Sequence, residues 1–94
     1  MKYYKKLFTD GVCTYTQELT QDSYIKQLTE QVQQFNDSKV VFMDNDSITV
    51  QKGLYILTRY TVDTPKRHKE VTSVYVGTID NNHILIKFYT EELK

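Results

Sequence analysis

Hydrophobic and polar positions divide the chain into one helical segment and a longer set of strand-like segments. In the helical segment apolar residues recur at steps of three and four, the spacing of one helix face: Ile25, Leu28, Val32 and Phe35, with Tyr24 alongside. The opposite face carries glutamines and a glutamate. The pattern predicts an amphipathic helix whose apolar stripe packs against the rest of the protein.

Local signals bound this helix. Thr20 fits the N-cap position, and Asp22 in the first turn complements the helix dipole. With Thr20 as the cap, Leu19 and Tyr24 occupy the two positions of a hydrophobic staple. The sequence Asn36-Asp37-Ser38 ends the helix, which gives a length of about 16 residues, or ~24 Å.

Two strand-like segments precede the helix, at residues 3–9 and 12–18. Between them stands Asp10-Gly11, a dipeptide typical of type I′ hairpin turns because both central residues need a positive φ. A two-residue turn predicts that Phe8 lies opposite Cys13 and Lys6 opposite Tyr15.

The chain after Lys39 has the pattern of a sheet. Strand-like runs cover residues 40–43, 48–51, 54–62, 71–79 and 84–90, and turn-forming or loop sequences separate them, among them a loop from Thr64 to Glu70. We therefore predict one α+β domain over residues 1–94. Its single amphipathic helix packs on a mainly antiparallel, meander-like sheet, in the order ββα followed by four or five strands.

Side-chain alternation sorts the last hairpin into two faces. If Asn81-Asn82 is its two-residue turn, the pairs Ile79–Ile84, Gly77–Ile86 and Tyr75–Phe88 share one face. We expect the helix to cover this face, to which the preceding strand adds Leu54, Ile56, Tyr60 and Val62.

The second face remains more apolar than a half-solvated antiparallel sheet normally is. It holds Tyr55, Leu57, Val74, Val76, Leu85 and Tyr89. The N-terminal hairpin could fold across this face, the sheet could curl toward a barrel, or the face could dock another chain. In the third case these six residues form a binding surface for another protein or for a second copy of the chain.

Composition narrows the class of protein. Hydrophobic residues make up 39% of the chain and charged residues 26%, as in globular proteins. Twelve basic and twelve acidic side chains give a formal net charge of zero, so no global field favours nucleic acid or a membrane. The N-terminus lacks the apolar region of a secretory signal, and we expect a cytoplasmic protein.

Residues with reactive side chains stand alone in the sequence. Cys13 could act as a nucleophile with His68 or His83 as base, but its place opposite Phe8 favours a small buried hydrophobic residue. Asp44-Asn45-Asp46 resembles the start of a calcium loop, without the required glycine and distal glutamate, and fits a turn better. We predict no catalytic residue, no metal site and no cofactor.

The only dense basic cluster is Lys66, Arg67, His68 and Lys69. It could bind phosphates, with Tyr55, Tyr60 or Tyr89 as stacking platforms. A solvated loop that keeps a sheet edge soluble is the alternative interpretation of the same cluster.

The apolar second face and the eight tyrosines favour a small non-enzymatic protein-binding domain. The absence of alanine and the excess of lysine over arginine suggest an AT-rich genome, which fits a phage or mobile-element inhibitor or accessory, or an immunity-type protein. The alternative function is a nucleic-acid-binding module that uses the basic loop 66–69.

Overall fold

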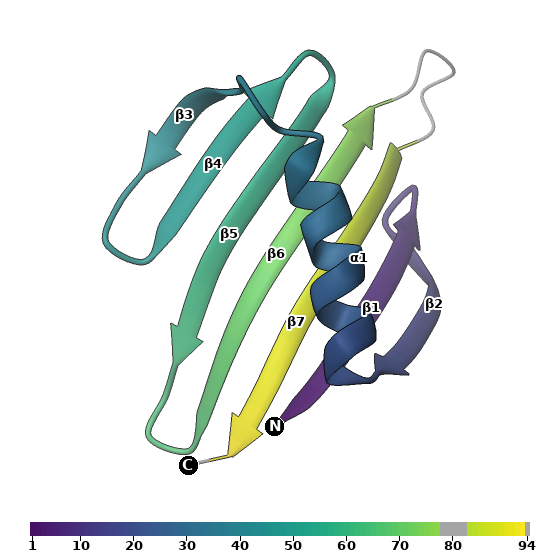
Figure 1. The fold of residues 1–94 in the computed structure, drawn as a ribbon, viewed down its shortest axis with the longest axis vertical. Coiled ribbons are helices and arrows are strands. Elements are labelled where there is room, and N and C mark those ends of the chain that lie inside the picture. Colours follow the sequence, from purple (N-terminus) through teal and green to yellow (C-terminus); the bar gives the residue numbers. More distant parts are fainter. Residues whose placement is uncertain (78–82, 94) are drawn as a thin grey trace.

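The computed structural model describes residues 1–77 and 83–93 and consists of one helix on one antiparallel sheet (Figure 1). The elements are β1 (Lys2–Thr9), β2 (Val12–Leu19), α1 (Gln21–Gln33), β3 (Lys39–Met43), β4 (Ser47–Lys52), β5 (Tyr55–Asp63), β6 (Arg67–Gly77) and β7 (His83–Leu93). The predicted α+β class and antiparallel sheet are confirmed.

The strands form a single sheet in the order β2-β1-β7-β6-β5-β4-β3. Strands β3 to β7 make a meander, and the N-terminal hairpin joins it through antiparallel pairing of β1 with β7. The first hairpin therefore widens the sheet and does not fold across one of its faces. Strands β2 and β3 are the two edges of the described sheet, far apart in Figure 1.

The N-terminal turn has the predicted backbone. Asp10 and Gly11 have φ values of 51° and 83°, and Phe8 pairs with Cys13 as expected. The second predicted pair is wrong, because Lys6 lies opposite Thr16. A β-bulge between Leu7 and Phe8 inserts one residue into the ladder and shifts every pair beyond it.

Helix α1 begins as predicted and ends earlier than predicted. The Thr20 side chain accepts a hydrogen bond from the backbone N–H of Ser23 at 3.2 Å, so Thr20 is the N-cap. Leu19 and Tyr24, the staple residues, lie in one buried cluster. The regular helix spans 13 residues, and turns continue the chain to Asp37, whose φ is 62°.

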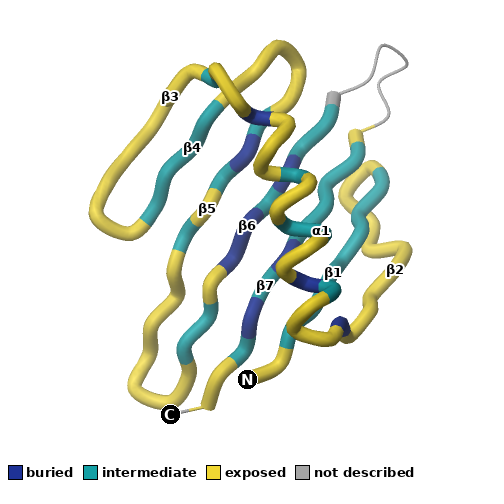
Figure 2. Tube along the Cα trace, viewed as in Figure 1, coloured by how far each residue is buried: buried dark blue, intermediate teal, exposed yellow. Residues whose placement is uncertain are grey.

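Helix α1 packs on β1 and β7, and Phe35 in the turn after it packs on β5 and β6, with the core between these elements and the sheet (Figure 2). One cluster joins Leu19 and Tyr24 to Phe88, and a second joins Phe35 to Leu57 and Val74. Burial raises the pKa of the Tyr24 hydroxyl above its ordinary value.

Two members of the predicted apolar stripe lie outside the core. Ile25 and Val32 are 52% and 47% exposed. The line of contact runs through Tyr24, Leu28 and Phe35, so the helix is rotated relative to the predicted stripe.

The predicted register of the last hairpin is also wrong. Tyr75 lies opposite Leu85, and Val74 lies opposite Ile86. The prediction assumes a two-residue turn at Asn81-Asn82, whereas the ladder ends with Gly77 opposite His83. The predicted turn and Ile79 of the Ile79–Ile84 pair lie outside the described residues.

The register error places residues on the wrong sides of the sheet. The shift is an odd number of residues, and an odd shift exchanges the faces of one strand relative to its partner. The helix consequently covers Val74 and Ile86 together, whereas Tyr75 and Leu85 lie on the opposite side, called the open face below.

Candidate functional site

The fold divides the six residues of the predicted partner surface between both sides of the sheet. Leu57 and Val74 are core residues beneath α1, and Tyr55 and Val76 lie opposite each other on the same side. Leu85 and Tyr89 are on the open face. These six residues therefore do not form one surface.

Cross-strand pairing arranges the open face in rows. Of three successive rows over β5, β6, β7 and β1, the outer two are largely aromatic or aliphatic and the middle one is polar and cationic. The rows are Tyr60–Val71–Tyr89–Tyr4, then Thr58–Ser73–Lys87–Lys6, then Ile56–Tyr75–Leu85–Phe8. Lysines thus lie between two bands of aromatic and aliphatic side chains.

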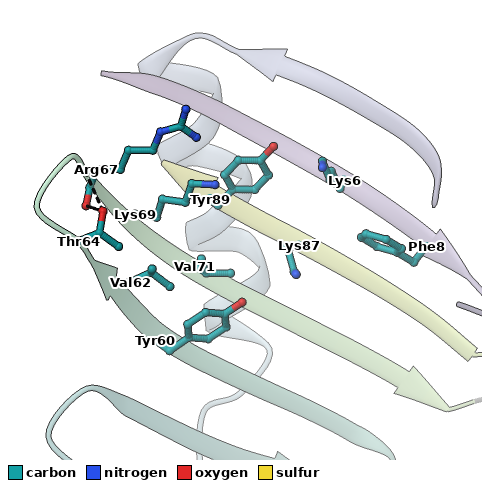
Figure 3. Close-up of a pocket in the computed structure, with 10 residues that line it drawn as sticks. All are labelled: Lys6, Phe8, Tyr60, Val62, Thr64, Arg67, Lys69, Val71, Lys87 and Tyr89. Atoms are coloured by element: carbon teal, nitrogen blue, oxygen red, sulfur yellow. Dashed lines mark hydrogen bonds between the residues drawn. The ribbon is translucent and has the colours of Figure 1, made fainter. Parts of the chain in front are cut away.

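A hollow of about 430 Å³ lies over the first two rows and extends toward the start of β6 (Figure 3). The lining side chains come from β1, β5, β6 and β7 and the turn after β5: Lys6, Phe8, Tyr60, Val62, Thr64, Arg67, Lys69, Val71, Lys87 and Tyr89. This lining has four cationic side chains and no carboxylate. In a chain with a formal net charge of zero, the hollow is thus a local concentration of positive charge.

Val71 lies between two tyrosines in the hollow. Although α1 covers the other side of the sheet, Val71 is only 4% exposed. Its cross-strand neighbours are Tyr60 on β5 and Tyr89 on β7. Two inter-strand spacings, roughly 10 Å, separate the backbones of these two tyrosines.

Aromatic and cationic side chains contact each other around the hollow. Tyr89 stacks on Tyr4 with ring centroids 5.0 Å apart. The ammonium groups of Lys6 and Lys69 each lie 5.5 Å from the centroid of the Tyr89 ring, and Lys87 lies 5.8 Å from that of Phe8. Such cation–π contacts hold the ammonium groups over the aromatic rings without neutralising their charge.

The lysines of the hollow have no acidic partner in the part of the chain that the structure describes. Lys6 and Lys87 are directly opposite each other on β1 and β7, and like charges at such positions destabilise a sheet. Salt bridges are formed at Arg67, which contacts Glu91 at 3.1 Å, and none is formed at Lys6, Lys69 or Lys87 within residues 1–77 and 83–93. The site is therefore chemically suited to an anion.

The four residues of the predicted basic cluster lie in different environments, because β6 begins within the cluster, at Arg67. Arg67 and Lys69 line the hollow. His68 lies 3.5 Å from Asp63 and 3.8 Å from Glu70, and Lys66 is in the exposed turn. The region predicted as a loop from Thr64 to Glu70 thus becomes strand from Arg67 onward.

Of the stacking platforms considered from the sequence, Tyr60 and Tyr89 line the hollow and Tyr55 lies on the helix side. Sequence reasoning missed Lys6 and Lys87. A usable signal was the alternation of lysine and aromatic residues at positions 2, 4, 6 and 8, which puts all four on one side of a strand.

Among the described residues no hydrogen bond joins Cys13 to His68 or His83. Cys13 is exposed on the edge strand β2, so the prediction of burial is wrong. Its Sγ lies 3.6 Å from the carbonyl oxygen of Tyr15. His83 stacks on Tyr75, whose hydroxyl group contacts Nδ1 of the histidine.

Asp44 has the role of a turn former. Its Oδ1 accepts hydrogen bonds from the backbone N–H groups of Asp46 at 2.8 Å and Ser47 at 2.7 Å. These hydrogen bonds, the one from Asp46 first, lower the pKa of Asp44 below its ordinary value. Among the described residues no group of three or more His, Cys, Asp or Glu side chains is placed to hold a metal ion.

Comparison with known proteins gives no family for this chain. No protein-family model matches it, and neither a curated protein nor a solved structure matches it significantly. Within the described residues no helix has the length and apolar character needed to cross a membrane.

Proposed function

We propose that this protein is a non-enzymatic module that binds single-stranded nucleic acid on the open face of its sheet. The observation that carries the proposal is the hollow in which Lys6, Lys69 and Lys87, without acidic partners among the described residues, surround a pair of tyrosines. Single-strand binders without sequence preference combine these two components, a cationic surface for the backbone and aromatic rings for the bases.

The cationic side chains of the hollow would bind the phosphate groups of the nucleic acid. Lys6 and Lys87 put like charges at directly opposite positions, with their ammonium groups over the Tyr89 and Phe8 rings. Phosphates bound beside these two groups would offset the unfavourable placement of like charges. Lys69 continues the positive charge along the start of β6, where Arg67 is already paired with Glu91. Three or four phosphate contacts are enough to make binding depend steeply on salt.

The tyrosine rings of the hollow would stack on the bases of the nucleic acid. Tyr60 and Tyr89 flank the nearly buried Val71, and their rings are the stacking surfaces that line the hollow. A base in a duplex is stacked on its neighbours and does not reach such a site. The proposal therefore favours a single strand over a duplex, and over an acidic peptide, which has no rings to stack.

The test is fluorescence anisotropy with a labelled mixed-sequence oligonucleotide of about 15 nucleotides, within the site sizes of known single-strand binders. We expect binding at about 50 mM salt, with an affinity that falls roughly 20- to 50-fold on raising salt to about 200 mM, as three or four phosphate contacts predict. The matching duplex is expected to bind more weakly.

Poly-glutamate serves as the second ligand in this experiment. Weaker competition by poly-glutamate than by unlabelled single strand, at equal charge, supports a role for the bases. Equal competition by the two polyanions would contradict base stacking, and no binding of the oligonucleotide at low salt would contradict the proposed function itself.

A further inference from the structure

Strand β3 forms an uncovered apolar edge of the sheet. Its residues Val40, Val41, Phe42 and Met43 are 52%, 48%, 54% and 69% exposed, and Figure 2 shows the whole strand as exposed. In the described sheet β3 pairs with β4 alone, so its outer backbone groups have no strand partner. Such an edge is a template for a further strand.

The opposite edge of the sheet has a different composition. Strand β2 carries threonine, glutamine and glutamate among its exposed residues, which are poor candidates for a dry interface. Strand β3 has four consecutive apolar residues, no proline and a single charged residue, Lys39 at its start. Of the common means of blocking edge pairing, β3 has little charge and no proline, and its protection is limited to its short length and one bulge.

We propose that β3 pairs antiparallel with β3 of a second copy of this chain. Charge complementarity at the two ends of the apolar run favours a second copy of the chain as the partner, since Lys39 precedes the run and Asp44 follows it. Antiparallel pairing about a two-fold axis sets Lys39 opposite the partner's Asp44, and it does so twice. In the free chain Lys39 has no carboxylate within salt-bridge distance among residues 1–77 and 83–93.

The bulge in β3 makes this register self-consistent. The pairing with β4 shifts between Val40 and Phe42, so that Val40 and Met43 lie opposite Val50 and Ile48, on the same side of the sheet. The proposed register sets Val40 opposite the partner's Met43. Opposite residues of an antiparallel pair must share a side, and without the bulge positions 40 and 43 would be on different sides.

The two-fold axis of such a pair is perpendicular to the sheet, so the open faces of both copies lie on the same side of one continuous sheet. The dimer does not depend on the proposed nucleic-acid binding, because β3 is outside the hollow. One short strand from each copy makes a small interface, so we expect a dimer whose population rises with concentration.

The test is light scattering coupled to size-exclusion chromatography over a dilution series from roughly 5 to 500 µM, the range expected for small interfaces. We expect the mass to approach twice the 11.1 kDa of the chain at the highest concentration. Phe42→Lys, which puts two additional charges at the interface, should return the mass to 11.1 kDa. Lys39→Glu should weaken the dimer through repulsion from the partner's Asp44.

Val12→Lys is the matched control, since Val12 is 64% exposed on the other edge strand. This variant should dimerise like the unmodified protein, and circular dichroism should show all three variants folded. A monomer at every concentration would overturn the proposal, as would a dimer that Val12→Lys disrupts and Phe42→Lys leaves intact.

Discussion

Lys6 and Lys87 lie directly opposite each other on neighbouring strands, although they are close to opposite ends of the chain. Directly opposed residues have Cβ atoms about 5 Å apart. The Lys6 ammonium group lies over the Tyr89 ring and that of Lys87 over the Phe8 ring, and neither has a nearby carboxylate among the described residues. An arrangement that is unfavourable for stability fits a surface selected for binding an anion.

Lys6→Glu should therefore affect stability and binding in opposite directions. Replacing a repulsive pair by an attractive one should raise the free energy of unfolding by about 0.5 kcal/mol. The same change should abolish most oligonucleotide binding. Urea denaturation and fluorescence anisotropy measure the two effects separately.

Lys26→Glu is the control for this charge reversal. Lys26 is exposed on α1, away from the open face, and the variant has the same net charge as Lys6→Glu. It should lower stability slightly, by repulsion from Asp22 and Glu30 one turn away, and leave most binding intact. Equal loss of binding in both variants would mean that only net charge matters and that the hollow is not the site.

The tyrosines of the hollow should matter through their rings. Tyr60→Leu and Tyr89→Leu keep an apolar side chain and remove the stacking surface, which is worth about 1–3 kcal/mol per base, or roughly 5- to 150-fold in affinity. Tyr55→Leu, on the helix side, should change affinity little. If all three variants bind as the unmodified protein does, bases do not stack in the hollow.

The helix cap gives a prediction about stability alone. Thr20→Ala removes the acceptor of the Ser23 N–H and should lower the free energy of unfolding by about 1 kcal/mol. Thr20→Ser keeps a hydroxyl group and should keep most of that stability. Chemical denaturation of the two variants checks this, and equal destabilisation would show that the hydrogen bond contributes little.

Asp44 gives a prediction about pH. Hydrogen bonds in the turn lower the folded-state pKa of its carboxyl group below the ordinary 3.8. A depressed folded-state pKa contributes stability that is complete above the unfolded pKa, about 3.9, and is lost as pH falls through the folded value. The Asp44 carboxyl carbon followed by NMR should titrate below 3.8; titration at or above that value would contradict the turn geometry.

Local elements of the fold could be predicted from sequence because short-range chemistry determines them. The positive φ angles at Asp10-Gly11 and the Thr20 cap depend on adjacent residues, and both predictions are confirmed. The register of β6 and β7 depends on the whole ladder and on neighbouring strands, and a prediction from one assumed turn was wrong. That error exchanged the covered and open sides of the sheet.

The candidate site could not be predicted in full from the sequence for a related reason. The pairing of β1 with β7 brings Lys6 beside Lys87, and nothing local at either residue indicates it. The basic cluster at residues 66–69 did mark one end of the hollow, since Arg67 and Lys69 line it. The other end, at Lys6 and Lys87, could be predicted only with knowledge of the strand order in the sheet.

NMR mapping of the bound single strand on the protein tests the proposed binding site directly. On titration with the unlabelled oligonucleotide at low salt, we expect the largest backbone amide shifts on the open-face strands around Lys6, Val71, Lys87 and Tyr89. Amides of the exposed side of α1 should shift little. Shifts centred on α1, or spread evenly over the protein, would contradict the claim that the lysine–tyrosine hollow is the binding site.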